Sequence, residues 1–161
     1  MTAPVLHPFQ PLDRAQAEAV LARNRVGRIV YARRGRLEVE PVLYALAEGW
    51  LWARTSYGCA WAALGDGDAH GSPVVFEVDE VEDGFRWRSV VVRGTLHAVE
   101  HPADGGDPAV WVHAVELIRA ADPRGAAEGA SSIRSSLVRI AVNEAVGREG
   151  AAGGHPGAGG G

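Results

Sequence analysis

The feature that most constrains the fold is a series of β-rich segments joined by links that are mostly turn-like. "LEVEPVLYAL" alternates apolar and acidic residues from Leu37 to Glu40, which is the two-residue period of a half-buried strand. The tight "AEG" turn joins it to "GWLWAR", so these two segments are expected to form a hairpin. Because neighbouring segments are linked mostly by hairpin turns, an antiparallel barrel is favoured over a doubly wound parallel sheet.

Six strands and three helices are expected along the chain. The expected strands are 26–33, 37–46, 49–54, 74–81, 87–100 and 136–146. Asp13 and Gln16 predict a capped helix over 13–24, and a short helix is expected near 58–65. A third helix begins after Asp107, and its apolar stripe leaves His113 expected to face solvent. Residues 1–146 are expected to form one domain, and the Gly-rich residues 147–161 a disordered tail.

Composition excludes several classes of function. The 161 residues carry a net charge of -4, which gives no electrostatic basis for binding nucleic acid. Cys59 is the single cysteine, so no intramolecular disulfide can form, and the absence of lysine removes Schiff-base chemistry. With no apolar run near the roughly 20 residues that span a bilayer and no secretory pattern at its start, the chain is expected to be cytoplasmic and not bound to a membrane.

A candidate anion site lies where the strand "GWLWAR" gives way to the short helix. Arg54 offers a planar fork that suits a phosphate, and Thr55 and Ser56 offer hydroxyl donors. Free backbone amides at the start of the helix, near Gly58, would add partial positive charge. The alternative is an ordinary turn, in which Ser56 caps the helix and Arg54 points to water. The residues alone leave both alternatives open.

Several stretches occur together in a recognisable order: "LDRAQAEAVLARNRVGRIVYA", "EPVLYALAEGWLWARTSYG" and "VVFEVDEVEDGFRWRSVVVRG", with "LVRIAVNEAVG" as the last strand. They resemble the pyridoxamine 5′-phosphate oxidase-like family over about residues 12–100. The resemblance implies a six-stranded antiparallel split β-barrel that binds FMN at the interface of a homodimer. It implies phosphate contacts from Arg54, Thr55, Ser56 and Gly58, and contacts near the flavin ring from Pro41, Val42, Trp87, Ser89 and Val90, the last three often from the partner subunit.

One position departs from the family pattern. Two residues after the glycine of the phosphate turn, where the family usually has a lysine, this chain has Ala60. The loss of a hydrogen bond to a charged group costs roughly 1.5–3 kcal/mol, so the phosphate is expected to bind less tightly. The sequence offers three candidate replacements but does not place them: Arg86, Arg88 and Arg93. Trp50 and Trp52 share a strand face with Arg54 and either line the flavin cleft or fill the core.

The expected function is that of an FMN-dependent oxidoreductase acting on a small molecule, because the cofactor would carry the hydride or electron chemistry. No catalytic residue is predicted. The alternatives are a deazaflavin-dependent reductase, a non-catalytic flavin or heme carrier, and a dimeric protein without a ligand. The histidines are scattered, and His97 and His101 lie in a strand and loop where a spacing of four does not align side chains. No metal site is therefore predicted.

Overall fold

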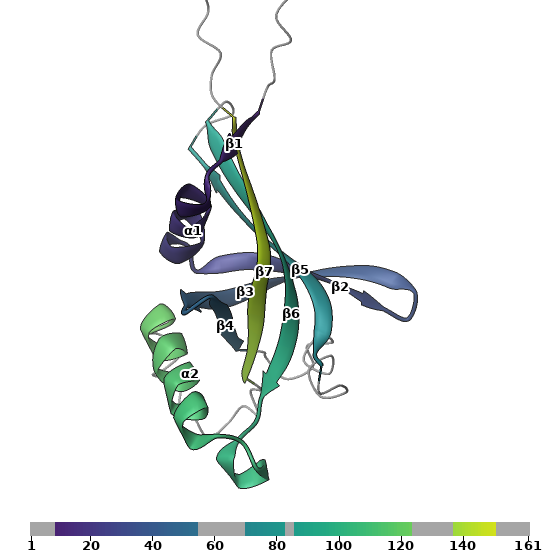
Figure 1. Cartoon of the computed structure of the whole chain (residues 1–161), viewed down its shortest axis with the longest axis vertical. Helices are drawn as coiled ribbons and strands as arrows, with labels where there is room; N and C mark the ends of the chain where they lie inside the picture. The colour runs from purple at the N-terminus through teal and green to yellow at the C-terminus, as the bar shows by residue number, and fades with distance from the viewer. Residues whose placement is uncertain (1–8, 55–69, 83–85, 124–136, 151–161) are drawn as a thin grey trace, which may run out of the picture.

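A computed structural model describes residues 9–54, 70–82, 86–123 and 137–150, and within them the chain forms an antiparallel sheet with two α-helices (Figure 1). The strands lie in the order β1-β7-β4-β3-β2-β5-β6, and a further pairing of β7 with β6 turns the sheet back on itself. This arrangement confirms the predicted mainly β, barrel-like split fold. The elements are β1 (Gln10–Leu12), α1 (Arg14–Arg23), β2 (Val26–Arg33), β3 (Arg36–Ala47), β4 (Trp50–Arg54), β5 (Ser72–Val81), β6 (Trp87–Val99), a 3-10 turn (Pro102–Asp104), α2 (Pro108–Ala121) and β7 (Leu137–Gly150).

Two tight turns set the register of the first three long strands. Arg34 and Gly35 connect β2 to β3, and Glu48 and Gly49 connect β3 to β4; all four residues have positive φ angles. Two successive residues with positive φ are typical of type I′ turns, whose twist matches that of the strands they join. The predicted hairpin between the second and third expected strands is therefore confirmed, with Tyr44 opposite Ala53.

The longest element of the sheet is the ribbon of β6 and β7, which pair from Trp87 and Gly150 at one end to Val99 and Leu137 at the other. The register shifts between Arg93 and Gly94. A side chain at Gly94 would collide with the carbonyl oxygen of Ala141, so the two backbones approach closely there. A bulge of this kind bends the ribbon, so that its two halves can pair in different parts of the barrel.

The core fills the interior of the barrel, and the two helices lie near opposite ends of the β6–β7 ribbon (Figure 1). At the α1 end, the buried hydroxyl of Tyr44 donates a 2.6 Å hydrogen bond to the carbonyl oxygen of Leu21. At the other end, α2 covers the outer face of the sheet and forms a second apolar cluster with it. The buried members of that cluster are Trp52, Val99, Ala114, Ile118 and Leu137.

Three sequence-based expectations need comment. The short strand β1, which pairs with β7, was not expected. Strand β7 continues to Gly150, so residues 147–150 belong to the sheet, although the predicted tail begins at 147; residues 151–161 lie outside the described residues. The predicted helix near 58–65 also lies outside them.

Of the helices in the described ranges, neither α1 nor α2 is both long and apolar enough to span a bilayer.

Candidate functional site

Arg54 is the last residue of β4, and its side chain lies on the outer face of the sheet. Tyr44 and Ala53 are opposite each other and both are buried in the core, so Arg54, one residue further, projects the other way. Trp50 and Trp52 share this outer face, as predicted, and Trp52 is buried in the cluster beneath α2. Trp52 therefore belongs to the packing between sheet and helix.

The guanidinium of Arg54 forms an ion pair with Asp122, with 3.7 Å between Nη2 and Oδ2. Asp122 caps the C-terminus of α2, where its backbone N–H donates to the carbonyl oxygen of Ile118. The C-terminal end of α2 thus places the carboxylate of Asp122 beside Arg54, which is the one described cation of the predicted phosphate site. This partner reduces the net positive charge that Arg54 can offer to an anion.

The other predicted phosphate contacts cannot be placed. Thr55, Ser56 and Gly58, together with Ala60, lie outside the described residues, so the cradle they would form stays a prediction. Pro41 and Val42 lie on β3 beyond the part that pairs with β4. Pro41 is exposed on the outer face, the face of Arg54, whereas the side chain of Val42 is buried in the core. A contact from Val42 to a cofactor would have to come from its backbone.

Trp87, Ser89 and Val90 lie at the start of β6. Trp87 is half-buried, and its ring packs against Phe9 with 5.2 Å between centroids. Ser89 is half-buried on the same strand face, and Val90 is buried in the core. Trp87 and Ser89 can therefore meet a ligand or a partner from the outer face, whereas the Val90 side chain cannot.

The register places Arg54 and the pair of Trp87 and Ser89 at opposite ends of the β6–β7 ribbon. Ser89 lies near the end of β7 at Arg148, whereas Arg54 pairs with Leu137 at its beginning, and Leu137 in turn pairs with Val99. At about 3.3 Å per residue, the strand separates Ser89 from Val99 by roughly 30 Å. One mononucleotide cannot reach both Arg54 and Ser89 within a single chain.

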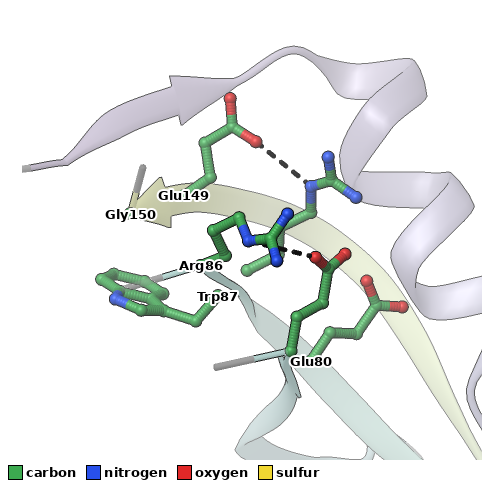
Figure 2. Close-up of a pocket in the computed structure, with 7 residues that line it drawn as sticks. Glu80, Arg86, Trp87, Glu149 and Gly150 are labelled. Carbon is green, nitrogen blue, oxygen red and sulfur yellow. Dashed lines mark hydrogen bonds and ion pairs between the residues drawn. The ribbon is translucent and has the colours of Figure 1, made fainter. Parts of the chain in front are cut away.

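A cavity of about 290 Å³ lies at the Trp87 end of the ribbon, and Figure 2 shows its charged lining. Arg88 donates to Glu149 at 3.1 Å, and Arg86 pairs with Glu82 at 3.7 Å. The lining holds three carboxylates and two guanidiniums, a balance that does not favour a phosphate. The lining residues are Glu80, Glu82, Arg86, Trp87, Arg88, Glu149 and Gly150.

None of the three arginines considered as replacements for the missing lysine lies near Arg54. Arg86 and Arg88 line the cavity at the far end of the ribbon. Arg93 lies on β6 and donates to Glu144 on β7 at 2.9 Å. In the described ranges, the half-buried arginine nearest in register to Arg54 is Arg139 on β7, which lies opposite Trp52. Arg139 was not among the site residues predicted from the sequence.

Arg139 lies against two tryptophan rings. Its Cζ is 4.3 Å from the ring centroid of Trp50 and 5.6 Å from that of Trp52. The buried Nε of Arg139 has no hydrogen-bond partner, and of the described side chains only one other buried polar atom shares this condition, Nε2 of His113. The His113 ring packs edge-on against Trp52 at 5.3 Å while its side chain is 39% exposed, so the expectation that His113 faces solvent holds only in part. Helix α2 turns this ring toward the sheet.

The histidines do not assemble a metal site within the described ranges. No group of three histidine, cysteine or carboxylate side chains there is arranged to hold a metal ion. The His97 ring lies 5.8 Å from that of Trp50, and the His101 ring lies 4.7 Å from that of Trp111. These rings pack against different aromatic neighbours.

Comparisons with known proteins agree with this architecture. A 1.95 Å crystal structure of an FAD-binding protein from Mesorhizobium loti has a TM-score of 0.69 and 26% identity, covering 89% of this chain and 99% of that one. A conserved protein of unknown function from Corynebacterium diphtheriae has a TM-score of 0.68 and 28% identity, covering 89% and 98%. An FAD and heme binding protein from Mycobacterium smegmatis shares the fold, with a TM-score of 0.63, 18% identity and coverage of 91% and 74%.

Sequence comparison identifies the family. No curated protein matches the sequence significantly. The profile of the family described as pyridoxamine 5′-phosphate oxidase matches residues 13–149, which span the fold from the cap of α1 almost to the end of β7. The chain therefore belongs to the pyridoxamine 5′-phosphate oxidase family.

Proposed function

We propose that this protein is a homodimeric flavin-binding oxidoreductase that acts on a small molecule, with each flavin held between two copies of the chain. The observation that carries the proposal is the separation of the predicted contacts along the β6–β7 ribbon. Arg54 lies at one end of this ribbon and Trp87 and Ser89 at the other, so one flavin can contact both ends only if a second chain supplies one of them.

An exposed apolar stripe offers a surface for the second copy. Val26, Leu37 and Val39 are 59%, 76% and 58% exposed, and the register places all three with Pro41 on the outer face of the β2–β3 hairpin. Contiguous exposed apolar residues of this kind mark interaction sites. Since Pro41 is also a predicted flavin contact, the stripe would bring the partner to the cofactor.

The charges near Arg54 bear on which flavin would bind. A terminal phosphate carries about two negative charges at neutral pH, whereas each phosphate of a dinucleotide carries fewer. FMN is the cofactor that the family resemblance implies, but Arg54 already faces Asp122 and the second cation of the family is replaced by Ala60. The Mesorhizobium loti relative is described as FAD-binding. These observations favour FAD over FMN as the cofactor.

The chain's own residues would bind and shield the cofactor. A flavin would supply the hydride or electron transfer, which is why the site needs no acid–base pair from the protein. Arg54 would hold a phosphate through charge-assisted hydrogen bonds. The half-buried Trp87 ring, supported by Phe9, would cover part of the flavin and limit access of water.

A subunit-mixing experiment tests the proposal. Arg54→Ala and Trp87→Ala each remove one half of the site, so each homodimer should lose tight binding of FMN and FAD. When the two variants are co-expressed, heterodimers keep one site with both Arg54 and Trp87 intact, and about a quarter of the wild-type binding capacity should return. Flavin bound per dimer, measured by absorbance after desalting, gives the readout.

The outcomes separate the parts of the proposal. If flavin binding does not recover when the variants are co-expressed, then either Arg54 and Trp87 of the same chain form one site, or one of these residues does not contact the flavin. A wild-type protein that binds neither flavin would overturn the cofactor assignment. A protein that binds flavin but whose flavin is never reduced by nicotinamide donors, and whose reduced flavin no acceptor reoxidises, would be a carrier and not an oxidoreductase.

A further inference from the structure

A second ligand site is indicated by Arg139, on the outer face of the sheet beside α2. Arg139 lies opposite Trp52 on β4 and opposite His97 on β6, so all three side chains share that face. The guanidinium lies over the Trp50 ring, at 4.3 Å from its centroid. A guanidinium stacked on a ring keeps its N–H groups directed outward in its own plane, where they can meet an acceptor.

The described part of the chain provides no acceptor for these N–H groups. No carboxylate among the described residues lies within ion-pair distance of Arg139, and its Nε is buried without a hydrogen bond. By contrast, Arg28, Arg88 and Arg93 on the same sheet each pair with a carboxylate. A guanidinium that lacks the anionic partner its neighbours have is one that an incoming anion can pair with.

The surroundings of Arg139 define the chemistry of that ligand. Trp50 and His97 are both half-buried, and their rings contact each other edge-on, which leaves an aromatic wall with partial access from solvent. His113 Nε2, the other unpartnered atom, lies on the α2 side of Trp52 and can donate in one tautomer. The nearest described acid, Glu48, is 3.9 Å from that nitrogen but is 77% exposed, so solvent screens its charge.

We propose that Arg139 and Trp50 bind a planar organic carboxylate. The carboxylate would accept two parallel hydrogen bonds from the two Nη groups of Arg139, since the buried Nε is out of reach of a ligand. The flat body of the ligand would pack along the exposed edge of Trp50 and His97. This site does not depend on the flavin assignment, because its cation is Arg139, which lies two residues along β7 from the partner of Arg54.

A titration with benzoate tests the site, with chloride used to keep the ionic strength constant. In the full-length protein, saturable binding by calorimetry should accompany shifts of the Trp50 and Trp52 indole N–H signals in ¹H–¹⁵N spectra. The Trp87 signal, at the other end of the ribbon, should not move. Arg139→Gln should weaken binding at least tenfold, since it removes both hydrogen bonds to the carboxylate. Arg119→Gln removes an exposed arginine from α2 and serves as the matched control, with unchanged binding expected.

Two further arms make the result decisive. Arg139→Lys keeps the charge but loses the planar fork, so its affinity should fall between those of the wild type and Arg139→Gln; it also serves if Arg139→Gln does not fold. Cyclohexanecarboxylate, which is not flat, should bind several-fold more weakly than benzoate. The proposal is overturned if benzoate does not saturate, if Arg139→Gln binds it as well as the wild type, or if inorganic phosphate binds as tightly with the same dependence on Arg139.

Discussion

The two ends of the β6–β7 ribbon differ in how their charged side chains are paired. At the end beside α1, each carboxylate of the cavity faces an arginine: Glu80 accepts from Arg23, Glu82 pairs with Arg86 and Glu149 with Arg88. At the end beside α2, Arg54 has one distant carboxylate, and Arg139 has no described acceptor.

The difference separates structural charges from charges available for binding. Glu80 connects β5 to the end of α1, because it accepts hydrogen bonds from both Arg23 and Asn24. Such pairs fix the position of a helix on the barrel. Cations that the fold leaves weakly compensated can instead interact with an incoming anion. The α2 end is therefore the end where anionic ligands are expected.

The strongest test of this contrast is Arg54→Ala. Under the proposed function it should weaken flavin binding by at least tenfold, because a charge-assisted hydrogen bond to phosphate is lost. The thermal stability of the protein without flavin should change little, since the Arg54–Asp122 pair is long and partly exposed. Fluorescence titration gives the affinity, with Arg119→Ala as control. Equal affinities in the variant and the wild type would move the phosphate away from Arg54.

Glu80→Gln tests the α1 end, where the effect should fall on stability. The hydrogen bonds from Arg23 lower the pKa of the Glu80 carboxyl below its ordinary value. The stabilisation is therefore complete above the unfolded pKa of about 4.5 and is lost as the pH falls through the lower folded pKa. The substitution should cost about 1 kcal/mol at pH 7, because Arg23 is half exposed, and much less at pH 3.

Urea denaturation at the two pH values measures this loss. Flavin affinity should stay within a factor of about two of the wild type if the two ends are independent. A variant that loses flavin binding without losing stability would contradict the assignment of Glu80 to structure.

The smallest expected effect belongs to Asp122→Asn. Removing this charge frees Arg54 from its ion-pair partner, so FMN affinity should rise about threefold and FAD affinity less, since a terminal phosphate carries more charge. Asparagine keeps the shape of the side chain at the helix end. Parallel titrations with the two flavins provide the comparison. A loss of affinity for both would show that Asp122 positions Arg54 for binding instead of competing with the phosphate.

Local pattern was sufficient for much of the fold. Strand β3 and the Asp13–Gln16 capping box of α1 both form as the sequence predicts. The faces of β3 are reversed at its start, however, because Leu37 and Val39 are exposed while Glu38 and Glu40 are half-buried. Sequence-based prediction was less successful for contacts between residues that are distant in sequence. Asp122 meets Arg54 through the end of α2, and Arg139 meets Trp50 through the pairing of β7 with β4. The contact of His113 with Trp52 was missed because an apolar stripe identifies the buried face of a helix but not the aromatic ring that lies beside the edge of that face.

The length of the β6–β7 ribbon has a thermodynamic consequence. If one flavin must contact both ends, and these belong to different copies, cofactor binding and subunit association are linked equilibria. The factor by which subunit association raises the affinity for flavin must equal the factor by which flavin raises the affinity of one subunit for the other. Diluting the loaded protein should then release cofactor and monomers together, and excess flavin should keep dimers intact at concentrations where the empty protein dissociates.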